Sequence, residues 1–139
     1  MKRVLLDLNV LLDVILDRQP HAVEAGRLWA ALEAGGGKGY VPAHGMTTLY
    51  YLIEKARGAR FARQAVDALL TVFGVARVDD AVLRRAVALG WPDFEDAVCA
   101  AAAEAARCDL IASRDPEGFP DSPVRVSEPA TALAWLATR

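Results

Sequence analysis

Three aspartates stand beside apolar segments, and their placement is the first sign of chemistry in this sequence. Asp7 comes directly after the apolar run 4–6, Asp96 stands near the start of an alanine-rich segment, and Asp115 follows the apolar run 110–112. Carboxylates that gather in one place repel one another unless a cation neutralises them. Oxygen ligands suit Mg²⁺ or Mn²⁺, and such an ion polarises a phosphoryl group and generates hydroxide for in-line attack.

Each aspartate also has a purely structural interpretation when it is taken alone. Asp7 could cap a following helix, although Asn9 is a plausible N-cap of that helix too. Asp93 and Asp96 are three residues apart at a helix start, where a cap and the helix dipole favour carboxylates. Asp115 precedes a proline, which is a common turn arrangement. Only the joint placement of the three favours a site, so the fold must bring them together.

Apolar periodicity predicts the elements that would position these residues. We expect strands at residues 3–6, 40–41, 75–78, 110–112 and 124–126, and helices at residues 10–17, 20–34, 44–56, 59–73, 79–89, 94–107 and 129–138. This alternation predicts one three-layer α/β/α domain over residues 1–139, with a central, mostly parallel sheet of four to five strands. In open sheets of this kind the functional site lies beyond the carboxyl ends of the strands, where Asp7 is expected.

The helix predicted at 94–107 is unusually slim. Its alanines allow it to pack close to the sheet, which would bring Asp96 toward the strand ends.

The motif "GGGKGY" at 35–40 looks like a phosphate-binding loop, but it lacks that loop's glycine spacing and runs from helix to strand, so it predicts a helix stop and a turn.

Composition excludes several classes of protein. Hydrophobic residues make up 54% of the 139 residues and the net charge is -2, so the chain is a folded protein without a globally basic surface. No apolar stretch reaches the roughly 18 residues that a membrane span needs, and Asp7 and Asn9 interrupt any signal-peptide core, so we expect a soluble, cytoplasmic protein with no membrane partner. Cys99 and Cys108 lack zinc-site spacing and are expected to be reduced core residues.

At these motifs the sequence resembles the PIN-domain proteins, the fold of the VapC-type toxin ribonucleases. The resemblance covers nearly the whole chain and rests on "VLLDLNVLLD" at 4–13, on "DFEDAVCAAAAEAARCDLIASRD" at 93–115, and on the strand-helix alternation between them. It implies a Mg²⁺- or Mn²⁺-dependent ribonuclease in which Asp7, Asp96 and Asp115 are the catalytic residues and metal ligands. It further implies an RNA substrate, a cognate antitoxin and a homodimer.

The resemblance also suggests which residues support the ligands. Asn9 matches a small polar residue beside the family's acidic positions, and Asp93 and Ser113 are auxiliary candidates. The family usually has a Glu in the helix after the second strand, but here Thr48 takes that place, and its hydroxyl could orient a water. The site is therefore expected to be one carboxylate short.

Basic residues are the candidate RNA contacts. Arg57, Arg60 and Arg63 recur every three residues and could bind phosphates, as could Arg114, although a solvated helix face explains the spacing of the first three equally well. His44, near a helix start, is expected to have a capping or surface role.

Three other assignments compete with this one. A response-regulator receiver domain needs a lysine near its last strand, and the chain has only Lys2, Lys38 and Lys55. A haloacid-dehalogenase-like phosphatase needs a second aspartate where Asn9 stands. The alternative from a different class is a catalytically weak or inactive PIN fold that binds RNA or protein, which the missing Glu favours.

Overall fold

The computed structural model covers all 139 residues. Its main elements, in order, are β1 (Arg3–Leu6), α1 (Leu8–Ile15), α2 (His21–Glu33), β2 (Lys38–Pro42), α3 (Met46–Arg57), α4 (Ala59–Val72), β3 (Gly74–Ala76), α5 (Asp80–Leu89), α6 (Phe94–Ala105), β4 (Leu110–Ala112), β5 (Arg125–Ser127) and α7 (Pro129–Leu136). Short 3₁₀ turns lie at Ala43–Gly45 and Pro116–Gly118. Every predicted strand and helix is present, with bounds that differ by a few residues.

The five strands form a fully parallel sheet in the order β3-β2-β1-β4-β5. Leu5 of the central strand β1 pairs with Tyr40 of β2 and Ile111 of β4. The chain winds from β1 outward through β2 and β3, and then crosses to the other side of β1 for β4 and β5. The direction of winding therefore reverses between β1 and β4, and open α/β sheets bind ligands at the carboxyl ends of the strands beside such a reversal.

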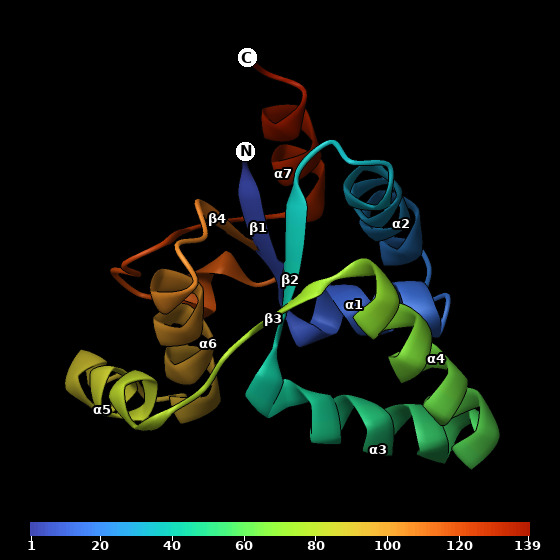
Figure 1. The fold of residues 1–139 in the computed structure, drawn as a ribbon, viewed down its shortest axis with the longest axis horizontal. Helices are drawn as coiled ribbons and strands as arrows, with labels where there is room; N and C mark the ends of the chain where they lie inside the picture. The colour runs from blue at the N-terminus through green and yellow to red at the C-terminus, as the bar shows by residue number, and fades with distance from the viewer.

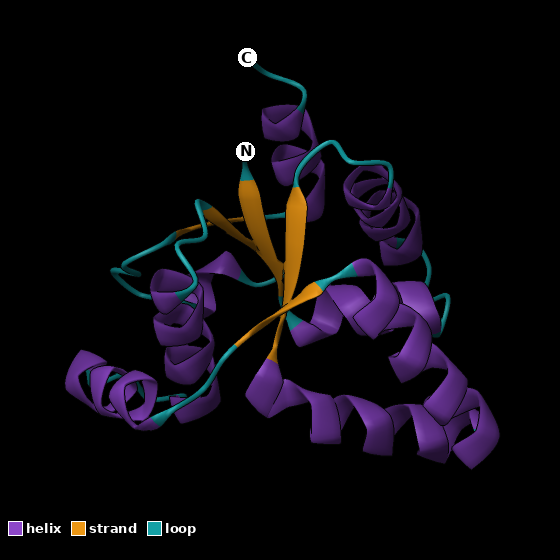
Figure 2. Cartoon of the chain, in the orientation of Figure 1, coloured by secondary structure: helices purple, strands orange, loops and turns teal.

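Helices cover both faces of the sheet (Figures 1 and 2). Helices α1, α2, α3, α4 and α7 pack on the face that carries Val4 and Leu6, while α5 and α6 pack on the face that carries Leu5. This alternation along β1 is the period of two that a strand buried on both sides requires. In Figure 1 the hairpin of α3 and α4 extends away from the sheet.

The slim helix predicted from the alanine-rich segment is confirmed as α6. Its buried residues include Ala97 and the run Ala100–Ala103, which let it lie close to the sheet. Cys99 and Cys108 are buried and unpaired, as expected. No helix combines the length and the apolar composition that a membrane crossing requires.

Candidate functional site

Asp7 stands where the central strand β1 meets α1. Its backbone N–H donates to the carbonyl of Ala112 at 2.9 Å, which extends the contact between β1 and β4 by one residue. Its Oδ1 accepts from the Leu8 N–H at 2.8 Å, so Asp7 is the N-cap of α1. The expectation that Asn9 caps this helix was wrong, because the helix begins two residues earlier than predicted. Burial raises the pKa of the Asp7 carboxyl, although the hydrogen bond from Ser113 opposes that shift.

Ser113 connects the ends of β1 and β4. Its hydroxyl donates to Oδ2 of Asp7 at 2.9 Å and accepts from the Asp115 N–H at 3.1 Å. Asn9 Nδ2 donates to the same hydroxyl at 3.4 Å, and Asn9 Oδ1 accepts from the Arg114 N–H at 3.3 Å. Ser113 is fully buried. This network holds the segment after β4 against the start of α1 and fixes the carboxylate of Asp7.

Asp96 reaches the same edge of the sheet from the N-terminus of α6. Asp93 is the N-cap of that helix and accepts from the Asp96 N–H at 3.0 Å. Partial burial, followed by the charges of Asp7, Asp93, Glu95 and Asp115, raises the pKa of Asp96 to about 7. Because charge repulsion weakens with distance, this shift reflects a cluster of carboxylates drawn from β1, α6 and the segment after β4.

Asp96 and Asp115 approach each other beside Gly118. A Cβ atom on Gly118 would lie 3.1 Å from Oδ2 of Asp115 and 3.2 Å from Oδ2 of Asp96. Asp115 is exposed, and its interaction with the Glu117 side chain raises its pKa. Two segments that are distant in sequence therefore direct carboxylate oxygens toward one spot, which the glycine leaves open.

The chemistry of this donor set fits a hard divalent cation. Its side chains are carboxylates, and Mg²⁺ and Mn²⁺ prefer oxygen ligands. A cation would also relieve the repulsion that raises the pKa of Asp96. No three acidic, histidine or cysteine side chains form a preassembled metal cage. The fit therefore rests on the nature and clustering of the donors and not on a complete coordination geometry.

Comparison with known proteins decides the family. The sequence profile of the PIN domain matches residues 3–117, a span that contains Asp7, Asp96 and Asp115. The chain belongs to the PIN domain family. The family expected from the sequence motifs is confirmed. No curated protein matches the chain.

Solved structures with the shape of this PIN domain include three toxin systems. VapC20 of Mycobacterium tuberculosis, a toxin that cleaves the sarcin-ricin loop, superposes with a TM-score of 0.68 at 18% identity, over 83% of this chain and 92% of that one. A toxin-antitoxin complex from Klebsiella pneumoniae superposes with a TM-score of 0.68 at 24% identity, over 91% of this chain and 97% of that one. VapBC2 of Rickettsia felis, bound to promoter DNA, superposes with a TM-score of 0.68 at 12% identity, over 91% of this chain and 98% of that one. These similarities confirm the predicted α/β fold.

Thr48 and His44 lie in the segment that follows β2 in this PIN domain. Thr48 is exposed in the first turn of α3 and forms no hydrogen bond with any acidic side chain. His44 is half-buried in the preceding turn, with Nε2 3.1 Å from the Glu95 carbonyl oxygen. Glu95 was overlooked in the sequence, yet its charge raises the pKa of both Asp7 and Asp96. The sequence did place Glu95 next to Asp96 in the first turn of a predicted helix, and this position could have identified it as part of the acidic cluster.

The four-residue spacing of Asp13 and Asp17 in the first predicted helix predicts that both are surface residues, and for Asp13 this prediction is wrong. Its side chain is fully buried. Arg18 Nε donates to its Oδ1 at 3.0 Å, and Arg114 Nη2 donates to the same oxygen at 3.3 Å. Arg114 Nε also lies 2.6 Å from Oδ2, as an ion pair without hydrogen-bond alignment. A carboxylate can be buried here because two guanidinium groups surround it.

The candidate RNA-binding arginines fall into two groups. Arg57, Arg60 and Arg63 are exposed on the hairpin of α3 and α4, with Arg57 stacked 4.1 Å from the ring centroid of Phe61. Arg114, in contrast, is engaged by Asp13. It anchors the segment between Ser113 and Asp115, and a contact with RNA stays a prediction for all four.

Proposed function

We propose that this PIN domain is a metal-dependent ribonuclease that hydrolyses RNA phosphodiester bonds and acts as the toxin of a toxin-antitoxin pair. One observation carries the proposal. Asp96 and Asp115 direct carboxylate oxygens toward one point beside Gly118, at the carboxyl edge of the sheet where Asp7 follows β1. The family and the toxin systems that share the fold support the same activity.

In this proposal Asp7, Asp96 and Asp115 hold Mg²⁺ or Mn²⁺. Such an ion supplies Lewis-acid stabilisation for the negative charge that develops on the phosphoryl group. Ser113 and Asn9 fix the carboxylate of Asp7, which limits the reorganisation that ligand binding requires. During hydrolysis a water oxygen bonds to phosphorus while the bond from phosphorus to the leaving ribose oxygen breaks.

The outer residues would complete the site. Asp93 holds the first turn of α6 and so positions Asp96. Thr48 would orient a water through its hydroxyl, in the place where the family usually has a Glu. The exposed Arg57, Arg60 and Arg63 would bind phosphates of the RNA strand away from the cleaved bond.

The competing proposal is a PIN fold that binds RNA or protein with weak or no turnover. Thr48 favours it, because Thr48 supplies no carboxylate, is exposed and forms no hydrogen bond with the acidic cluster. The clustering of the three aspartates opposes it, since a pure binding role gives no reason to retain carboxylates that repel one another.

A cleavage assay separates the two proposals. Purified protein is incubated with RNA in Mg²⁺ or Mn²⁺, and wild type is compared with Asp96→Asn and with the control Asp67→Asn, which changes an exposed aspartate on α4. We expect wild type and the control to cleave RNA, and Asp96→Asn to lose at least about a hundredfold in rate, since it removes a metal ligand. Equal cleavage by wild type and Asp96→Asn would refute the site. Binding of RNA by all three without cleavage would support the binding module.

The proposed partners follow from the toxin role. A cognate antitoxin would bind the chain, as in the toxin-antitoxin complexes that share its fold. We further propose a homodimer that acts on RNA in the cytoplasm. Light scattering on the purified chain measures whether it is a homodimer. Co-purification with the product of an adjacent small gene tests for the antitoxin.

A further inference from the structure

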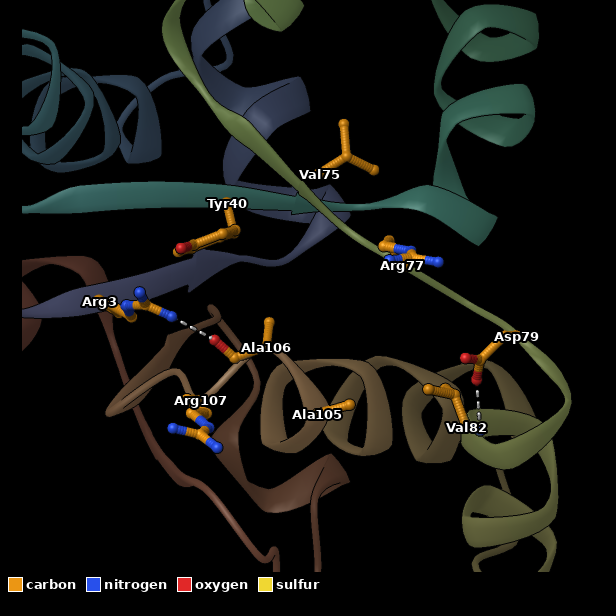
Figure 3. A pocket seen from close by; sticks show the side chains of 9 residues that line it. All are labelled: Arg3, Tyr40, Val75, Arg77, Asp79, Val82, Ala105, Ala106 and Arg107. Atoms are coloured by element: carbon orange, nitrogen blue, oxygen red, sulfur yellow. Dashed lines mark hydrogen bonds between the residues drawn. The ribbon is translucent and has the colours of Figure 1, made fainter.

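A cavity lies on the face of the sheet that α5 and α6 cover (Figure 3). It is a cavity of about 550 Å³ whose lining comes from β1, β2, β3, the start of α5 and the end of α6. It lies at the end of α6 opposite Asp96. Since Ala105 follows Asp96 by nine positions of helix, the two sites are about 14 Å apart along α6. The cavity is thus distinct from the carboxylate cluster.

Positive charge dominates this cavity. Arg3, Arg77 and Arg107 line it, and Asp79 is the only carboxylate among its lining residues. Asp79 is already engaged as the N-cap of α5, where Oδ1 accepts from the Val82 N–H at 3.0 Å. Three arginines from three parts of the chain therefore line this cavity, with little compensating charge.

Two of these arginines have no partner within the molecule. Arg3 Nη1 donates to the Ala106 carbonyl at 2.9 Å, which satisfies the end of α6, as Figure 3 shows. Arg77 and Arg107 are exposed, and the five ion pairs of the molecule and its side-chain hydrogen bonds all involve other residues. Their guanidinium groups are free to bind a ligand.

Arg107 occupies a backbone position that does not favour arginine. Its φ is 59°, and the Cys108 N–H closes the end of α6 on the Ala103 carbonyl. Glycine is the usual residue at such a left-handed helix end. The chain follows that rule at the end of α5, where Gly90 has a φ of 68°. The backbone gains nothing from a side chain at position 107, so the arginine is better explained by what its guanidinium contacts.

We propose that this cavity binds a phosphate-bearing ligand of mononucleotide size, with Arg77 and Arg107 as the phosphate contacts. Guanidinium groups bind phosphate oxygens in pairs, and the cavity volume lies in the range of small-ligand sites. Val82 and Ala105 provide an apolar wall for the rest of the ligand. The phosphate belongs either to a free nucleotide or to the 5′ end of an RNA strand.

Titration of the full chain with 5′-AMP, adenosine and inorganic phosphate, in EDTA, tests the proposal by NMR shifts or calorimetry. We expect saturable binding of 5′-AMP, weaker binding of phosphate and none of adenosine. Arg107→Gly and Arg77→Ala should each weaken 5′-AMP binding about tenfold, because each removes a charge-assisted contact. Equal responses to 5′-AMP and adenosine, or unchanged affinity in both variants, would overturn the proposal.

Two controls keep this result independent of folding and of the ribonuclease proposal. Arg107→Gly places glycine at a left-handed position, so its thermal midpoint should equal or exceed that of wild type. Arg27→Ala removes an exposed arginine on α2, outside both proposed sites, and should leave 5′-AMP binding unchanged. Both controls are measured in EDTA and without RNA cleavage, so a failed cleavage assay would not affect this outcome.

The same variants identify the source of the phosphate. One short oligoribonucleotide is compared with and without a 5′-phosphate, on Asp96→Asn in EDTA to prevent cleavage. An RNA end is the ligand if the phosphorylated strand binds more tightly than 5′-AMP and if a second substitution, Arg107→Gly, removes this difference. Affinity for the strand no greater than for 5′-AMP supports a free nucleotide.

Discussion

At the scale of single residues, the carboxylate cluster depends on short polar contacts and on one open position. Ser113 and Asn9 fix Asp7, Asp93 holds the turn that carries Asp96, and Gly118 leaves the space where Asp96 and Asp115 meet. Small changes in that space should alter the site without altering the fold.

Gly118→Ala tests this dependence. Its Cβ would lie 3.1 to 3.2 Å from one oxygen of each aspartate, so at least one carboxylate must move by a few tenths of an ångström. We expect RNA cleavage to fall by about tenfold, because catalysis is sensitive to small displacements of its ligands. The thermal midpoint should change little. The assay is the rate of cleavage in Mn²⁺ at saturating RNA.

Gly26→Ala is the matched control for that substitution. Gly26 lies inside α2 with no atom within 4 Å of an added Cβ. This variant should keep full cleavage and gain about 0.5 kcal/mol of stability, since alanine is the better helix former. Full activity of Gly118→Ala would show that the space between Asp96 and Asp115 is not part of the active arrangement.

At the scale of elements, α1 and the segment after β4 are joined by a buried ion pair. Asp13 holds Arg114, whose chain neighbours Ser113 and Asp115 both belong to the candidate site. The pair links residues 101 positions apart in sequence. It therefore couples the packing of α1 to the position of a proposed metal ligand.

Asp13→Asn should destabilise the fold and weaken the site together. The amide would leave two guanidinium groups without their anion, at a cost of about 2 kcal/mol in the free energy of unfolding. Asp17→Asn is the control, since Asp17 is exposed and its φ of 51° suits asparagine equally well. Urea denaturation measures both variants. Equal stability of Asp13→Asn and Asp17→Asn would contradict the structural role of the pair.

These contacts mark how far the sequence could predict the structure. Apolar periodicity located every strand and helix, because period and burial are local properties of the chain. The convergence of Asp7, Asp96 and Asp115 followed from the parallel sheet and from the slim alanine-rich helix that carries Asp96. The burial of Asp13 did not, since the residue that makes it tolerable, Arg114, is distant in sequence. The arginine cavity was missed for the same reason, because five elements contribute to it.

At the scale of the whole molecule, the candidate site opposes stability when no cation is bound. The pKa of Asp96 is about 7 in the folded state, against an ordinary value of 3.8. The folded state therefore holds this proton more tightly than the unfolded chain does between those two pH values. The contribution of the protonated Asp96 carboxyl to the free energy of unfolding is fully present below about pH 4 and is lost as the pH rises through about 7.

Thermal melts in EDTA should reveal this linkage. Between about pH 5 and pH 8, wild type and Asp67→Asn should lose more stability than Asp96→Asn, whose neutral amide removes one titrating carboxyl. Addition of Mn²⁺ at the higher pH should raise the midpoint of wild type and of Asp67→Asn, because an ion that binds only the folded state stabilises it. Asp96→Asn should respond far less. An identical pH dependence in wild type and Asp96→Asn would mean that the carboxylates do not repel one another in solution, and the metal site would lose its physical basis.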